Sequence, residues 1–229
     1  MKNKNIGLLG LAVAVTTVLW IVLLIFTEST TSTIENMDTK VMLIKSELFL
    51  YKMSYLNAGL LTFLNIMFMS ALYLYCKDKN DFWSTLGFAF IPIYGTTNLF
   101  AYLSQVFLIP DILELYISPA THSFAKLLLN LTIHTWAGSL VEAFNGMAYA
   151  LIGIPSIIFP LIGMRKTGLL AVGGYLLMAS GILSILAFLG ILISAGFLIL
   201  LSVAGGVIFL ISLILISYYF LIIDVVHEN

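Results

Sequence analysis

Charged residues are scarce in this sequence of 229 residues. Lysine and arginine together number 10, and aspartate and glutamate number 11, so that 9% of the chain is charged, against about 25% in soluble globular proteins. A water-soluble domain of this size could not cover its surface with so few charges, and a mean hydropathy of +1.10 agrees with this. The composition excludes an ordinary soluble domain and a disordered chain. The net charge of −1 provides no electrostatic attraction for nucleic acid.

Cysteine and the common catalytic motifs are also missing or rare. Cys76 is the only cysteine, so no intramolecular disulfide can form. The chain has no Gly-x-Ser-x-Gly, no His-Glu-x-x-His and no phosphate-binding loop. His122 and His134 lie twelve positions apart, which is no standard metal spacing, and no third ligand accompanies them. We therefore predict no catalytic residue, no metal and no cofactor, and we favour a protein that is not an enzyme.

Long apolar runs are what the sequence has instead. The charge-free runs cover 5–27, 53–76, 82–110, 127–164 (which Glu142 alone interrupts) and 167–223. A helix needs about 20 apolar residues to cross the bilayer. Each of the first four runs therefore fits one crossing. The fifth would be about 85 Å long as a single helix, so it must fold back into two. Because the runs are continuously apolar rather than alternating, they predict helices and not strands.

The sequence thus predicts an all-α, polytopic membrane helix bundle with six transmembrane helices in one transmembrane domain over 1–229. The expected spans are 6–26, 49–76, 82–108, 137–163, 168–192 and 198–223. We expect a Ser/Thr-rich outer loop at 27–46, an inner turn at 77–81, a second at Arg165-Lys166 and a membrane-embedded turn at 194–196. The first apolar run exceeds the usual length of a signal-peptide core and lacks a clear cleavage site, so an uncleaved span is preferred.

Orientation follows from lysine and arginine alone. With the N-terminus inside, the inner positions are Lys2, Lys4, Lys77, Lys79, Arg165 and Lys166, and the outer positions are Lys40, Lys45, Lys52 and Lys126. With six spans, this inner excess predicts a multi-pass protein with both termini in the cytoplasm, most simply in the cell membrane.

The segment 119–135 between the third and fourth spans differs from the rest. Large apolar residues recur near helical spacing, at Phe124, Leu127, Leu128, Leu131 and Trp136, with Ser123, Lys126, Asn130 and His134 between them. This pattern is typical of a helix that lies in the membrane interface. The alternative is that these residues begin a longer fourth span. A helix over 119–163 would be about 67 Å long, so we expect a break near Gly138.

Polar residues inside the apolar runs predict a cluster in the outer half of the bundle. Its candidates are Asn98, Tyr102, Gln105, Glu142, Asn145 and Tyr149, with His134 and Asn65 as weaker members. Glu142 is the only carboxylate within an apolar run, and such a group is a functional-site hypothesis by default. Amides in hydrocarbon need partners, and Asn98 and Gln105 could find them in Glu142 and Asn145. The cluster would bind a proton or ligand, or it would be an interhelical hydrogen-bond contact.

Two stretches carry a resemblance to known proteins. The first is Phe144-Asn145-Gly146-Met147-Ala148-Tyr149-Ala150 followed by Ile154-Pro155, and the second is Gly163-Met164-Arg165-Lys166-Thr167-Gly168-Leu169-Leu170. They resemble small six-span prokaryotic membrane proteins of a domain-of-unknown-function family. The resemblance covers about two spans and implies six helices. It implies no activity and transfers no catalytic residue.

Three functional hypotheses follow. The first is a non-enzymatic membrane protein, either an accessory subunit with a membrane protein partner or a binder of lipid or another apolar ligand. The second is a small-solute transporter or channel that uses the polar cluster. The third is a membrane-embedded enzyme in which Glu142 and His134 act as the acid–base groups. The lipid bilayer is a partner in all three, and the sequence does not determine the oligomeric state.

Overall fold

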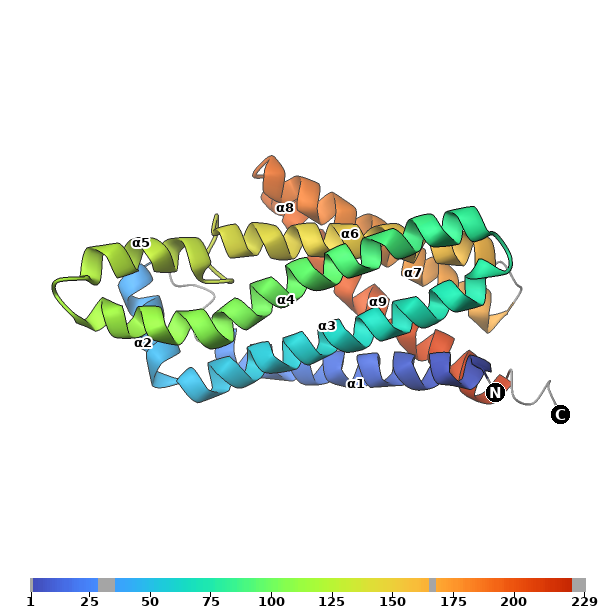
Figure 1. The fold of residues 1–229 in the computed structure, drawn as a ribbon, viewed down its shortest axis with the longest axis horizontal. Coiled ribbons are helices and arrows are strands. Elements are labelled where there is room, and N and C mark those ends of the chain that lie inside the picture. The colour runs from blue at the N-terminus through green and yellow to red at the C-terminus, as the bar shows by residue number, and fades with distance from the viewer. Residues whose placement is uncertain (1, 29–35, 165–167, 224–229) are drawn as a thin grey trace. The chain divides into compact units, whose positions relative to one another are not determined.

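The computed structural model describes residues 2–28, 36–164 and 168–223, which are almost entirely helical (Figure 1). The helices are α1 (Lys2–Glu28), α2 (Met37–Ser46), α3 (Leu48–Lys77), α4 (Asp81–Ile117), α5 (His122–Thr132), α6 (Leu140–Gly163), α7 (Leu169–Leu192), α8 (Gly196–Ile199) and α9 (Leu201–Tyr218), followed by the π-helical turn η1 (Tyr219–Ile223).

Within the described residues, six helical segments are long and apolar enough to cross a membrane. They are Asn3–Thr27, Leu48–Lys77, Asp81–Ile117, Leu140–Gly163, Leu169–Leu192 and Gly196–Ile222. The chain is therefore a multi-pass integral membrane protein, and the predicted all-α bundle of six spans is confirmed.

The chain divides into two compact units. The α7–α9 unit consists of Met1–Val15, Thr62–Thr97 and Gly146–Asn229, and the α2–α5 unit consists of Thr16–Leu61 and Asn98–Asn145. Helices α1, α3, α4 and α6 each contribute one part to each unit.

Small residues allow helices to approach closely in the α7–α9 unit. A Cβ atom added at Gly181 of α7 would lie 2.6 Å from the backbone oxygen of Gly153 of α6. On α7, the Ser180 hydroxyl donates a hydrogen bond of 2.9 Å to the backbone oxygen of Gly205 on α9. Without a hydrophobic driving force between helices in lipid, such close packing and interhelical hydrogen bonds hold a bundle together.

The end of α6 is stabilised by a lysine. Pro155 and Pro160 lie inside this helix, as the sequence indicates. The Lys79 ammonium donates to the backbone oxygen of Gly163 at 2.7 Å and lies 3.7 Å from the ring centre of Tyr75. A cation at a helix C-terminus pairs with an otherwise unbonded carbonyl and with the negative end of the helix dipole.

The α2–α5 unit has its own apolar core. In Figure 1, α5 lies beside the C-terminal part of α4. The core consists of Met37, Val41, Ile44, Tyr51, Tyr55, Ala58, Tyr102, Val106, Ile109, Ile112, Leu113, Ala125, Leu129 and Ile133. Helix α5 contributes only one face to this core, which leaves its other side exposed.

Helix α2 corrects the expectation of a loop over 27–46. The Asn36 carboxamide accepts a hydrogen bond of 2.8 Å from the backbone N–H of Asp38, which caps the helix start. The buried residues of α2 are Met37, Lys40, Val41 and Ile44. This spacing is typical of a helix. The Ser/Thr-rich residues that precede it favour a loop, and the predicted loop was therefore extended too far, to residue 46.

Helix α4 corrects the expected end of the third span at 108. It continues through Pro110 to Ile117. Proline removes only one N–H group, and burial of Ile109 and Ile112 in the core holds the following turns helical.

Two predicted breaks are present. Gly138 separates α5 from α6 with a φ of 80°, and Ser194 separates α7 from α8 with a φ of 55°. The Arg165-Lys166 turn and the C-terminal segment 224–229, including His227, lie outside the described residues.

A polar contact joins the first turn of α2, the last turn of α4 and the middle of α5. The Asp38 carboxylate accepts hydrogen bonds from the Lys126 ammonium at 2.7 Å and from the Tyr116 hydroxyl. These bonds favour the ionised carboxylate, and the Lys126 bond is the main reason why the pKa of Asp38 is lowered.

Candidate functional site

Gln105 of α4 is the centre of the polar cluster. Its Oε1 accepts hydrogen bonds from the Tyr51 hydroxyl at 2.7 Å and from the backbone N–H of His134 at 3.0 Å. Its Nε2 donates to the backbone oxygen of Thr132 at 2.9 Å and to the hydroxyl of Ser104 at 2.9 Å. A carboxamide offers two acceptor positions and two donor hydrogens. The side chain is fully buried, and all of its hydrogen-bonding capacity is used. We call these four contacts the Gln105 clasp.

Aromatic rings surround the clasp. Tyr55 of α3 lies 4.8 Å from Tyr51 and 6.1 Å from Tyr102, measured between ring centres. Trp20 of α1 lies 6.2 Å from Tyr102. These distances are in the range of favourable aromatic pairs. Tyrosine and tryptophan also concentrate at the membrane–water boundary, so the rings are consistent with a position of the clasp near one face of the bilayer.

His134 lies in the segment between α5 and α6, against the same rings. Its ring centre is 5.5 Å from that of Tyr55 and 5.6 Å from that of Tyr102. Its Nδ1 is 3.3 Å from the Tyr55 hydroxyl, whereas its Nε2 is buried and makes no hydrogen bond. The pKa of His134 is lowered to about 4, chiefly by burial. An interaction with the Asn145 side chain raises this pKa, and the positive charge of Lys40 lowers it further. The imidazole is therefore neutral near pH 7.

This lowered pKa predicts an acid-sensitive fold. The unfolded chain binds a proton at His134 below about pH 6.5, whereas the folded chain binds it only near pH 4. The stability that the neutral ring contributes is present above pH 6.5 and is lost progressively as the pH falls to 4. Melting temperatures of the wild type measured in detergent should fall across this interval, and those of His134→Asn should fall less. Equal slopes for both proteins would contradict the assignment to His134.

Asn98 and Asn145 face one another in the same unit. The Asn145 Nδ2 donates to the Asn98 Oδ1 at 2.9 Å. Asn98 is buried and Asn145 is half-buried. The rings of Phe100 and Phe144 meet edge to face beside them, 5.8 Å apart. The amide pair thus satisfies polar groups that would be costly alone in hydrocarbon.

Glu142 has a local partner rather than Gln105. Its Oε2 accepts a hydrogen bond of 2.7 Å from the backbone N–H of Gly138, and the Ser139 hydroxyl accepts one of 3.0 Å from the backbone N–H of Glu142. Together they form a capping arrangement at the start of α6. The Ser-x-x-Glu spacing of Ser139 and Glu142 is the sequence signal for it.

The other two candidate residues belong to the α7–α9 unit. Asn65 donates a hydrogen bond of 3.2 Å to the Tyr94 hydroxyl, and its own Oδ1 is buried without a partner. Tyr149 is half-buried on α6. The structure thus brings together Tyr102, Gln105, His134, Asn98 and Asn145 in one unit and assigns Asn65 and Tyr149 to the other.

Sequence reasoning missed three residues of the cluster. Tyr51 and Tyr55 lie one helical turn apart at the start of α3, and this spacing was the available signal. Lys40 is only 4% exposed and donates to the backbone oxygen of Thr135 at 3.3 Å. No sequence pattern identifies its burial, because the residues it packs against are distant in the chain.

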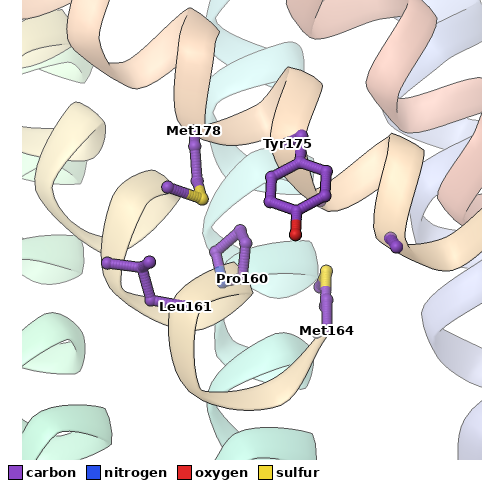
Figure 2. A pocket seen from close by; sticks show the side chains of 7 residues that line it. Pro160, Leu161, Met164, Tyr175 and Met178 are labelled. Atoms are coloured by element: carbon purple, nitrogen blue, oxygen red, sulfur yellow. The ribbon is translucent and has the colours of Figure 1, made fainter. Parts of the chain in front are cut away.

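The metal-ligating side chains of the described residues are scattered. Among the described residues, no group of three or more histidine, cysteine, aspartate or glutamate side chains could hold a metal ion. A small pocket between α6 and α7 is lined by Pro160, Leu161, Met164, Ala171, Gly174, Tyr175 and Met178 (Figure 2). Its volume of about 10 Å³ is that of roughly one water molecule.

Comparison with known proteins adds no assignment. The chain matches no protein-family model, no curated protein and no solved structure. The resemblance to six-span prokaryotic proteins therefore stays a prediction.

Proposed function

We propose that this protein is a non-enzymatic membrane protein, either an accessory subunit that binds a membrane protein partner or a binder of lipid or another apolar ligand. The observation that carries the proposal is the saturation of Gln105. A side chain whose donors and acceptors are all bonded within the protein has none left for a solute. The Gln105 clasp thus acts as an interhelical contact.

The remaining candidates support the same interpretation. Asn98 and Asn145 are paired with each other, and the carboxylate of Glu142 is occupied by helix capping. Polar groups that satisfy each other between helices commonly stabilise membrane bundles. The large apolar surface of the spans then remains for contact with lipid or with a protein partner.

Native mass spectrometry of the protein, gently extracted from its own membrane, tests the proposal. A co-purified protein supports the accessory subunit, and a retained lipid or apolar molecule supports the binder. A protein that arrives bare in every mild detergent, and that moves a solute across vesicle membranes, would contradict both forms.

One observation favours a second candidate, a small-solute transporter or channel. The Nε2 of His134 is buried without a hydrogen bond, close to the paired Asn98 and Asn145. An unmet polar group in such a place is a reason to look for a ligand. This candidate requires that the segment containing His134 open, because the rings of Tyr55 and Tyr102 cover it.

Substitution at Glu142 tests a transporter in which the Glu142 carboxylate takes part. Glu142→Gln retains an oxygen that can accept from the Gly138 N–H, so the melting temperature should change little. Ser139→Ala, which removes the cap hydroxyl, should cost about 1 kcal/mol. Under the first proposal, solute flux into vesicles is the same for wild type and Glu142→Gln. A flux that this substitution abolishes, with stability unchanged, would favour the transporter.

The enzyme hypothesis has less support. Acid–base chemistry requires Glu142 and His134 within hydrogen-bond reach of a common substrate. In the described residues, the Glu142 carboxylate bonds to Gly138 and the His134 ring to Tyr55, and the two side chains make no hydrogen bond with each other.

The proposed location is the cell membrane, with both termini in the cytoplasm. The six-to-four distribution of lysine and arginine supports it. Reporter fusions to each terminus, active only on one side of the membrane, test the orientation.

A further inference from the structure

We propose that α5 binds the surface of the lipid bilayer, with the side chains of Phe124, Leu127 and Leu131 inserted among the lipid chains of the nearer leaflet. This inference goes beyond the proposed function, because it holds whichever partner or ligand the spans bind.

Helix α5 has three distinct sectors, and this division is the first argument. Ala125 and Leu129 are buried in the core. A second sector is apolar yet exposed, with Phe124 at 59%, Leu127 at 56% and Leu131 at 45%. The third is polar and consists of Ser123, Lys126 and Asn130. A helix that faces only water does not need the exposed apolar sector, whereas a helix between lipid and water needs both outer sectors.

Exposed apolar side chains on the spans of the same unit are the second argument. On α4, Phe100 and Phe107 lie two turns apart on one face and are both exposed. Leu140, the first residue of α6, is exposed as well. The Thr132 backbone oxygen bonds to Gln105, which places the Leu131 end of α5 beside this part of α4. The α2–α5 unit thus presents exposed apolar side chains on α4, α5 and α6, as lipid contact requires.

The size of the sector argues against a second copy of the chain as its occupant. An aromatic side chain buries about 150–250 Å² and leucine is smaller, so these three half-exposed side chains offer at most about 300 Å². A stable protein interface buries about 800 Å² on each partner. Lipid chains need no such minimum area, because each exposed apolar group gains by leaving water independently.

The charges at the polar side of α5 agree with an interfacial position. Lys126 is bonded to Asp38 at 2.7 Å, so it is neutralised within the protein. The bonds from Thr132 and His134 to Gln105 tie the C-terminal end of α5 to a membrane-spanning helix. Helix α5 is therefore held at the membrane both by its apolar sector and by the Gln105 clasp.

Site-directed spin labelling tests the position of α5. Single cysteines at Leu127 and Leu131 are labelled with a nitroxide in full-length protein in phosphatidylcholine vesicles. Ser123→Cys is the matched control on the polar sector. The native Cys76 is buried, and the wild type measures its background. Only variants that elute and melt like the wild type are used. Molecular oxygen concentrates in lipid chains, whereas a nickel chelate stays in water.

The expected result is that labels at 127 and 131 collide more with oxygen than with the nickel chelate, and that the label at 123 shows the reverse. Greater access to nickel at 127 and 131 would overturn the proposal, because the sector would then face water. Labels shielded from both reagents, or broadened by a neighbouring label, would overturn it in favour of a protein partner or a second copy.

Discussion

Replacing Gly181 by alanine is expected to destabilise the protein strongly, although the substitution adds only one methyl group. The new Cβ would lie 2.6 Å from the backbone oxygen of Gly153, and a backbone atom cannot rotate away. Helices α6 and α7 would have to separate. Overpacking of this kind costs typically 1–3 kcal/mol, more than the roughly 1 kcal/mol that alanine gains over glycine in a helix. Leucine at this position should prevent folding altogether.

A matched control exists on α9. A Cβ added at Gly206 meets nothing within 4 Å, so Gly206→Ala should leave the melting temperature unchanged or raise it slightly. Gly153→Ala should resemble Gly181→Ala, because its Cβ would lie 2.7 Å from the backbone oxygen of Gly181. The double variant should lose less than the sum of the two losses, since one separation relieves both contacts. Full additivity, or a Gly181→Ala protein as stable as Gly206→Ala, would contradict this packing.

Replacing Gln105 by leucine is the second change with a large expected effect. It leaves the backbone N–H of His134 and the backbone oxygen of Thr132 without their partner. A buried group left unsatisfied costs about 1–3 kcal/mol. For the two groups together we therefore expect a loss of roughly 2–6 kcal/mol, seen as a fall of several degrees or more in melting temperature.

The size of this destabilisation depends on whether the His134 N–H and the Thr132 oxygen form new hydrogen bonds in the variant. Hydrogen bonds between membrane helices average only about 0.6 kcal/mol, because side chains often find new partners. Thr132 is the last residue of α5, where carbonyl oxygens have no partner within the helix. The loss should therefore exceed that average.

A double-mutant cycle with Tyr51 tests the clasp directly. Tyr51→Phe removes the hydroxyl that donates to Gln105, and its cost should shrink when Gln105 is already leucine. Thr96→Val is the control on α4, because the Thr96 hydroxyl bonds only to the Pro92 oxygen of its own helix. If Tyr51→Phe costs the same with and without Gln105, the bond between the two carries no stability.

Much of the fold could be predicted because it depends on local composition. Charge-free runs longer than the bilayer is thick can only be spans, and Gly138 with a positive φ is where a helix break was expected. The errors were also local. Helix α2 was missed although Asn36 is a good cap, and α4 passes through Pro110 although proline usually ends a helix.

The candidate site was less predictable, because its partners are far apart in the chain. Gln105 was identified as a polar side chain that needs hydrogen bonds, but its partner Tyr51 is 54 positions away. Glu142 was considered for proton binding, and the structure bonds its carboxylate to Gly138, only four positions away. A polar residue within an apolar run indicates that a hydrogen-bond partner exists, but the sequence does not identify that partner.

The sequence by itself determined that this is a membrane protein of six helices, because the cost of placing charge and unbonded backbone in hydrocarbon leaves no other arrangement for these runs. Only the tertiary structure decided how the polar groups are used. The hydrogen-bonding groups of Gln105 are all used in the Gln105 clasp, and Asn98 is hydrogen-bonded to Asn145. The physical reason is that hydrophobic exclusion acts on each segment alone, whereas a hydrogen bond between helices requires two specific atoms within about 3 Å.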